Sequence, residues 1–175
     1  ADAVAVPQIL YNVPSRTACD LLPGTVARLS KIANVVALKE ASPDPLRPQQ
    51  LAKALLESED SSGPIDILSG DDINALAYIK QGAKGVVSVT ANVAPQLVHA
   101  LCEAALTGDY PTAEKLDAQL RPLNTTLFVE TNPIPTKWAL AEMGKIAPGI
   151  RLPLTPLSKD NHNVVRAAMA EVGVL

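Results

Sequence analysis

The chain has 175 residues, of which 47% are hydrophobic, and a formal net charge of −3. This length is enough for one sizeable core and does not require two domains. The small negative charge, with Lys and Arg scattered singly, argues against nucleic acid and acidic membranes as partners. No run approaches the roughly 20 apolar residues of a membrane span, and the basic start of a secretory signal is missing. We expect a cytoplasmic protein.

Cysteine and histidine are sparse. Cys19 and Cys102 are too few and too far apart for a metal knuckle or a disulfide framework, which fits a reducing compartment. His99 and His162 have no second histidine or cysteine at ligand spacing. We therefore expect no metal site and no cofactor.

Short apolar runs alternate with helical patterns over the first 107 residues. The expected strands are residues 8–11, 35–39, 65–69 and 85–89, and the helices that follow them are 23–33, 47–57, 73–81 and 95–106. Four βα units in a row favour parallel strands. The charged segment 57–64 is typical of a solvated loop.

After Gly108 the pattern is wholly helical. Helices are expected over residues 110–128, 134–143 and 161–172, with a proline-rich loop at 148–157. The sequence therefore predicts two regions: 1–107, part of a barrel, and 108–175, a C-terminal helical segment.

Parallel βα units close most simply into a (β/α)8 barrel, which has eight strands and about 250 residues. Only four strands are expected here. The alternative is an open doubly wound sheet, but no βα junction carries its glycine-rich phosphate turn. We therefore expect an α/β fold, the C-terminal half of a TIM barrel followed by the helical segment.

Lys39 ends the apolar run that begins at Val35. Strand alternation places Val35, Ala37 and Lys39 on one face, which in a barrel points inward at the mouth where active sites lie. A lysine ammonium on a buried strand is costly unless it is paired or deprotonated, and the neutral amine is the form that attacks a carbonyl. Lys39 is thus a candidate Schiff-base nucleophile. The alternative is a lysine whose head reaches solvent from the strand end.

Tyr11 ends the preceding strand in the equivalent place. A phenol there can pass protons to and from a carbinolamine through a hydrogen-bonded relay. The alternative is an aromatic ring that caps the core. Arg16 follows the Val13-Pro14 turn, where a guanidinium beside a cleft can bind a substrate carboxylate; its alternative role is a surface ion pair with Asp20.

The third strand ends in Ser69-Gly70-Asp71-Asp72. Gly70 allows close approach of the backbone to a ligand, and Asp72 is a candidate N-cap of the next helix. No histidine or third acid is close in sequence, so an aldolase here would be of the lysine type and not of the metal-dependent type.

Six motifs stand in order along the chain. They are YNVPSRT (11–17), LKEA (38–41), LSGDD (68–72), GVVSVTAN (85–92), NPIPTK (132–137) and RLPLTP (151–156). Together they resemble the C-terminal portion of the dihydrodipicolinate synthase family, over nearly all of the chain. The resemblance implies a fragment or truncated form of a lyase that condenses pyruvate with aspartate semialdehyde in lysine biosynthesis.

The resemblance also implies roles for individual residues. Lys39 matches the lysine that forms the Schiff base with pyruvate, Tyr11 the tyrosine of the proton relay, and Arg16 the arginine that binds the aspartate semialdehyde carboxylate. The backbone at Val87 lines the pyruvate pocket, with Gly70 beside it. The family's quaternary structure implies a homo-oligomer, a dimer of dimers.

Two other functions stay open. One is a sibling Schiff-base lyase acting on a keto sugar acid, although Arg16 favours the synthase. The other is a non-catalytic half-barrel that associates through open strand edges and an uncovered inner face. The side chains expected on that face are Ile9, Val35, Ala37, Ile67 and Val87.

Overall fold

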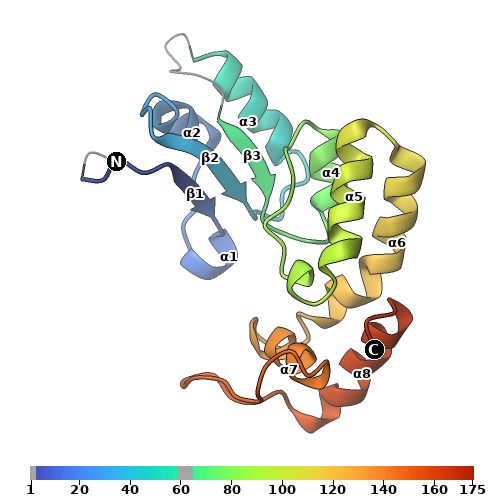
Figure 1. The fold of residues 1–175 in the computed structure, drawn as a ribbon. Coiled ribbons are helices and arrows are strands. Elements are labelled where there is room, and N and C mark those ends of the chain that lie inside the picture. The colour runs from blue at the N-terminus through green and yellow to red at the C-terminus, as the bar shows by residue number, and fades with distance from the viewer. Residues whose placement is uncertain (1–2, 59–64) are drawn as a thin grey trace. The chain divides into compact units, whose positions relative to one another are not determined.

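The computed structural model describes residues 3–58 and 65–175, which form two compact units, Ala1–Val87 and Ser88–Leu175 (Figure 1). The expected loop 57–64 therefore lies largely outside the described residues. Within the described part of the chain, no helix has both the length and the apolar character needed to cross a membrane. The two units separate after Val87 because each is compact by itself. The boundary expected after residue 107 was drawn where strands and helices give way to helices alone, and it stays a prediction.

The first unit contains a parallel three-stranded sheet in the order β1-β2-β3. Its elements are β1 (Gln8–Asn12), α1 (Pro14–Thr17), α2 (Pro23–Leu29), β2 (Val35–Glu40), α3 (Arg47–Leu56), β3 (Asp66–Ser69) and α4 (Ala75–Lys80). The alternation of strands and helices expected from the sequence is confirmed. The short helix α1 was not expected, because four residues are too few for a periodic pattern.

The prediction of a fourth strand over residues 85–89 is wrong in extent. In the structure this segment makes a single parallel bridge, between Ser69 and Val86. Two hydrogen bonds flank this bridge, from Ser69 N to Gly85 O at 2.9 Å and from Val87 N to Ser69 O at 2.8 Å. The chain then turns at Ser88, whose Oγ accepts a hydrogen bond from Ala91 N. Strand pairing therefore stops after one bridge.

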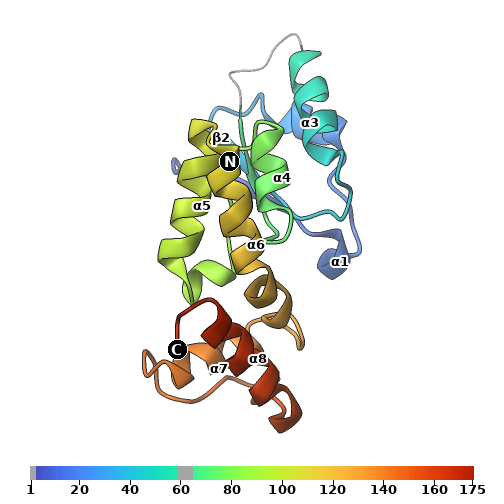
Figure 2. The ribbon, with the colours of Figure 1, turned by 90° about the vertical axis from the view of Figure 1, so that its right-hand side faces the viewer.

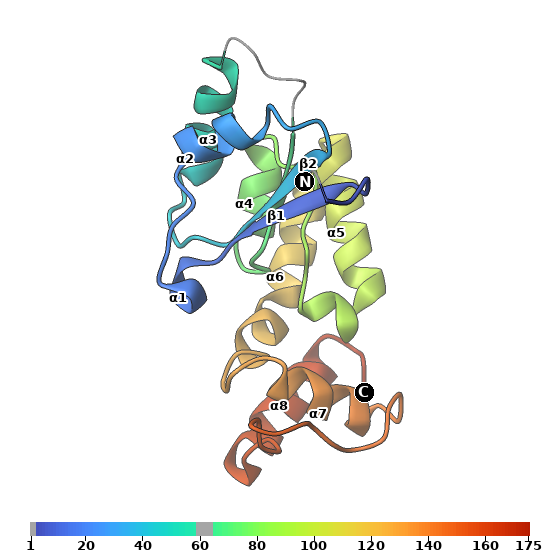
Figure 3. The ribbon, with the colours of Figure 1, turned by 90° about the vertical axis from the view of Figure 1, so that its left-hand side faces the viewer.

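One face of the sheet is covered by α2 and α3, which lie together on the same side of β1 and β2 in Figure 3. The fully buried Leu38 of β2 packs with Val26 of α2 and Leu51 of α3. Each helix starts with a proline in its first two positions, where a missing N–H costs nothing. Lys39 therefore faces away from these helices, since neighbouring strand side chains alternate.

Ile67 was expected on the inner face of the sheet, and the pairing register of β3 shows that this expectation is wrong. Leu38 pairs with Ile67, and Ile67 packs against the core under α2 and α3. Leu68 is the residue opposite Lys39. Ile67 is thus on the helix side, because a shift of one residue moves every side chain of a strand to the other face.

The second unit is helical, with a short 3-10 helix η1 (Thr90–Asn92) and the helices α5 (Pro95–Thr107), α6 (Tyr110–Thr126), α7 (Ile134–Glu142) and α8 (Lys159–Glu171). Figure 2 shows α5 and α6 side by side. Gly108 joins them with a φ of 85°, a conformation that favours glycine, and Asp109 caps α6 by accepting a hydrogen bond from Thr112 N. The three helices expected after Gly108 are confirmed.

Candidate active site

Tyr11 and Lys39 stand opposite each other at the carboxyl ends of β1 and β2. The Lys39 Nζ lies 4.1 Å from the centroid of the Tyr11 ring, close enough for a cation–π contact. Lys39 is half-buried, while half of the Tyr11 surface is exposed, so the ring does not cap the core. The structure thus brings the amine and the phenol-bearing side chain together.

Gly70 lies on the other side of Lys39. Its N–H donates to Glu40 O at 2.7 Å. A Cβ at this position would be 3.1 Å from Lys39 Cε and 2.8 Å from Ala41 Cβ. Gly70 therefore leaves room for the Lys39 side chain, and a larger residue would push against it.

Val87 is tied to the end of β3 by the hydrogen bond from its N–H to Ser69 O. Its side chain is partly exposed. Ser69 is the residue before Gly70, so the backbone at Val87 and Gly70 belongs to the same end of the sheet as Lys39.

Arg16 lies on α1, directly after β1, and is exposed. Its proposed ion pair with Asp20 is absent, because Asp20 accepts hydrogen bonds from Asn12 and Arg47 instead. Within residues 3–58 and 65–175, the guanidinium makes no hydrogen bond or ion pair, and it does not join the Tyr11–Lys39 pair. A guanidinium placed in this way is available to a ligand that arrives from solvent.

The surroundings of Asp71 and Asp72 indicate structural roles for both carboxylates. The helix α4 begins at Ala75 after Asn74, so the expectation that Asp72 is the N-cap is wrong by two residues. Asp71 accepts a hydrogen bond from the Asn74 side chain at 2.7 Å. In the described ranges, no cluster of three or more His, Cys, Asp or Glu residues is suited to a metal ion.

The sequence reasoning missed a buried polar pair behind the site. Asn12 follows Tyr11 and is 2% exposed, and Glu40 follows Lys39 and is fully buried. The Asn12 Nδ2 lies 3.0 Å from each Glu40 carboxylate oxygen. The sequence did hold a signal for this pair, since Asn12 and Glu40 each directly follow a candidate residue. Strand alternation then places both on the face opposite Tyr11 and Lys39.

Two ionisable groups around this pair are perturbed. The hydrogen bond from Asn12 holds the pKa of Asp20 below its usual value, and the Arg47 guanidinium acts in the same direction against the effect of burial. Burial raises the pKa of Tyr78, and the negative charge of Glu40 adds to this shift. The Tyr78 hydroxyl donates to Asp44 O at 3.3 Å.

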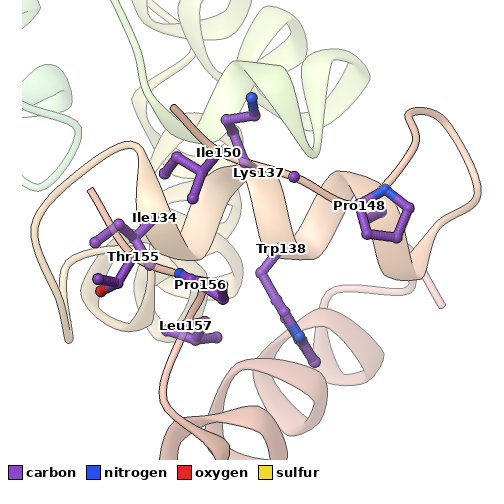
Figure 4. Close-up of a pocket in the computed structure, with 10 residues that line it drawn as sticks. Ile134, Lys137, Trp138, Pro148, Ile150, Thr155, Pro156 and Leu157 are labelled. Atoms are coloured by element: carbon purple, nitrogen blue, oxygen red, sulfur yellow. The ribbon is translucent and has the colours of Figure 1, made fainter. Parts of the chain in front are cut away.

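The second unit contains a separate, largely apolar pocket of about 270 Å³ (Figure 4). It is lined by Ile134, Lys137, Trp138, Ala141, Pro148, Gly149, Ile150, Thr155, Pro156 and Leu157. Trp138 also stacks on His162, with ring centroids 4.7 Å apart. Two of the sequence motifs, at 132–137 and 151–156, contribute to its wall.

Parallel strands covered by helices, with a lysine at a strand end, are features of part of an α/β barrel. The chain belongs to the dihydrodipicolinate synthetase family, whose model matches residues 1–172. It is 54% identical over 174 residues to the 4-hydroxy-tetrahydrodipicolinate synthase of Coxiella burnetii (strain Dugway 5J108-111), covering 99% of this chain and 57% of the relative. The match to the same-named protein of Pseudomonas savastanoi pv. phaseolicola is 54% over 175 residues, covering 58% of that protein.

Solved structures agree with this assignment. The chloride-inhibited dihydrodipicolinate synthase from Acinetobacter baumannii, complexed with pyruvate, matches with a TM-score of 0.92 and 42% identity. The comparison covers 99% of this chain and 58% of that one. The synthase from Aquifex aeolicus matches with a TM-score of 0.91 and 39% identity. The chain thus spans somewhat more than half the length of the relatives it matches.

Proposed function

We propose that this chain is part of a 4-hydroxy-tetrahydrodipicolinate synthase, a lyase that condenses pyruvate with aspartate semialdehyde in lysine and diaminopimelate biosynthesis. The observation that carries the proposal is the Lys39 amine, at a strand end, beside the Tyr11 ring. Family membership supports the choice of reaction, and the match to a pyruvate complex supports the choice of first substrate.

Lys39 is the proposed nucleophile. Its neutral Nζ attacks the keto carbon of pyruvate and forms a carbinolamine, which loses water to give the Schiff base. Loss of a methyl proton then gives an enamine, whose carbon attacks the aldehyde of aspartate semialdehyde. Tyr11, at the same strand level, is the proposed group that relays protons to the leaving hydroxyl.

Three residues are proposed to bind substrates. Arg16, exposed on α1, pairs with the carboxylate of aspartate semialdehyde, since a guanidinium can make two parallel hydrogen bonds to it. The backbone at Val87 and Gly70 lines the pyruvate pocket. The close packing of Gly70 against Lys39 supports its place there.

The assembly and location of the protein are proposals of the same kind. We infer a cytoplasmic homo-oligomer, a dimer of dimers, in which no metal or cofactor takes part. The resemblance to the family is the support for this assembly.

A substrate comparison tests the function. A full-length enzyme that carries these 175 residues should condense pyruvate with aspartate semialdehyde far faster than with a sugar aldehyde such as N-acetylmannosamine. Faster turnover with the sugar aldehyde would make the protein a sibling Schiff-base lyase. No turnover of pyruvate with either aldehyde would favour the non-catalytic association module.

A further inference from the structure

The face of the sheet opposite Lys39 holds a carboxylate that the proposed reaction does not use. Glu40 is fully buried on β2. Burying an isolated carboxylate costs several kcal/mol unless hydrogen bonds replace its water, so this group needs a structural reason. It is the residue directly after the candidate nucleophile, at the carboxyl end of the same strand.

Both oxygens of Glu40 are satisfied by the chain itself. Asn12 Nδ2 donates to Oε1 and Oε2, each at 3.0 Å, and Ser42 N donates to Oε1 at 2.6 Å. One partner is at the end of β1 and the other lies two residues beyond Glu40. The carboxylate therefore joins the end of β1 to the turn that follows β2.

The Asn12 amide is used completely. Besides Glu40, its Nδ2 donates to Asp20 Oδ1 at 2.8 Å, and its Oδ1 accepts from Leu21 N at 2.9 Å. Asn12 thus also holds the segment between α1 and α2. One amide therefore links β1 and β2, which bear Tyr11 and Lys39, to the segment that follows α1.

Backbone hydrogen bonds continue past the ends of the strands. Ala41 N donates to Asn12 O at 2.9 Å, and Gly70 N donates to Glu40 O at 2.7 Å. The side-chain pair and these backbone bonds act on the same few residues. The side-chain pair and the Ala41–Asn12 bond fix the separation of β1 and β2 where Tyr11 and Lys39 stand, and the Gly70–Glu40 bond ties β2 to the end of β3.

The outer part of the network includes a positively charged residue, Arg47. Arg47 Nη2 pairs with Asp20 Oδ2 at 2.6 Å, and Arg47 Nε donates to Ser42 Oγ at 3.3 Å. Tyr78 lies on the other side, where its hydroxyl is shared between the backbone oxygens of Ser42 at 3.4 Å and Asp44 at 3.3 Å. Among the residues that the structure describes, the Glu40 carboxylate itself accepts only from Asn12 and Ser42, and Arg47 and Tyr78 in turn contact Ser42.

We propose that Glu40 is a positioning residue for Lys39: its buried carboxylate, held by Asn12 and the Ser42 amide, keeps the Lys39 amine over the Tyr11 ring. This inference rests on the proposed function, because the position matters only if Lys39 reacts with pyruvate. Glu40 is fully buried on the face opposite Lys39, so it acts through Lys39. A displacement of about 1 Å in a reacting group can lower a rate by about 10²-fold.

The test is Glu40→Gln in the full-length enzyme. Glutamine keeps the size of the side chain but turns one acceptor into a donor, which must face Asn12 Nδ2 or Ser42 N. We expect kcat to fall about 10- to 100-fold while KM for pyruvate changes by less than about threefold, because geometry at the amine is altered and pyruvate contacts are not. Glu57→Gln removes an exposed carboxylate outside the network and is the matched control, with kcat unchanged.

Circular dichroism and thermal unfolding separate positioning from folding. A folded Glu40→Gln enzyme with kcat within about twofold of the parent would overturn the inference. A loss of kcat equal to the loss of folded protein would also overturn it. If Glu40→Gln does not fold, Asp20→Asn tests the less buried end of the network, where kcat should fall several-fold at unchanged KM and an unchanged kcat would overturn the proposal.

Trapping of the Schiff base with pyruvate and borohydride distinguishes a failure of the positioning role from a failure of the proposed function. A parent enzyme that forms no adduct contradicts the proposed function. A parent that is trapped, with Glu40→Gln trapped equally fast and turning over normally, contradicts only the positioning role.

Discussion

Arg16 and Lys39 lie on different elements, and this separation predicts different roles. Arg16 is on α1 beyond the end of β1, whereas Lys39 faces Tyr11 on the sheet. We expect Arg16→Ala in the full-length enzyme to raise KM for aspartate semialdehyde about 10-fold or more, as loss of a charge-assisted contact does, with pyruvate trapping unchanged. Steady-state kinetics and trapping on the same variant check this. Equal loss of both activities would give Arg16 a structural role.

Gly70 gives a second prediction for a single residue. A methyl group there would meet Ala41 Cβ at 2.8 Å and the Glu40 carbonyl oxygen at 3.1 Å. Since backbone and a Cβ have little freedom to move, we expect Gly70→Ala to destabilise the fold by about 1–3 kcal/mol and to displace Lys39. Denaturant unfolding measures the first effect and the trapping rate the second. Gly24→Ala, where a methyl meets nothing within 4 Å, is the control.

At the level of residues, the sequence predicted the part of the site that follows from strand ends. Tyr11, Lys39 and Gly70 meet because parallel strands bring their carboxyl ends to one edge. The contact between Asn12 and Glu40 was not predictable in the same way, since it needs the register of two strands 28 residues apart and the loop that encloses them. The exposed position of Arg16 also depends on how α1 folds after Pro14.

Among the elements, length and hydrophobic period predicted the long helices well. The errors fall where tertiary hydrogen bonds decide. The strand expected at residues 85–89 ends after one bridge, because Ser88 starts a turn. Ile67 faces the helices because β3 pairs with β2 in a register that no local pattern reveals.

The ion pair between Asp20 and Arg47 connects the segment after α1 to the start of α3. The pKa of Asp20 is lowered in the folded protein, chiefly by the Asn12 hydrogen bond. A lowered folded pKa contributes stability above the unfolded value of about 4, and this stability is lost as pH falls through the folded pKa. Because the side chain is 32% exposed and screened, we expect a contribution of less than about 1 kcal/mol.

Acid unfolding of the parent and of Asp20→Asn checks this pH dependence. The variant should be less stable near neutral pH, and the difference should shrink as the pH falls below about 4, where the parent carboxylate takes up its proton. A difference in stability that stays constant with pH would contradict the assigned role of the charge. Asp66→Asn, at an exposed position in the same unit, is the control.

At the scale of the whole molecule, the sheet has an open edge. β1 is the first strand in the order, and its Ile9 side chain is 56% exposed; Val87, after the last bridge, is 40% exposed. Val35 and Ala37, which were expected on an uncovered face, are buried at 5% each. Of the residues expected on that face, Ile9 and Val87 are therefore exposed, whereas Val35 and Ala37 are not.

Open strand edges with apolar side chains favour association. We expect the 175-residue chain by itself either to self-associate or to be stable only alongside the rest of the enzyme, and to show little or no synthase activity. The expected loss of activity follows because these residues cover 57% of the length of the relative from Coxiella burnetii. Light scattering and a coupled assay on the purified chain test both statements. A stable monomer with full turnover would contradict them.

The most direct test of the central claim is borohydride reduction of a full-length enzyme in the presence of pyruvate, followed by peptide mapping. We expect the reduced adduct on Lys39, because this lysine ends a buried strand beside Tyr11. Lys39→Arg, which keeps the charge but removes the nucleophilic amine, should give no adduct. An adduct on Lys53, Lys80 or Lys137, or none in the parent enzyme, would contradict the Schiff-base function assigned to Lys39.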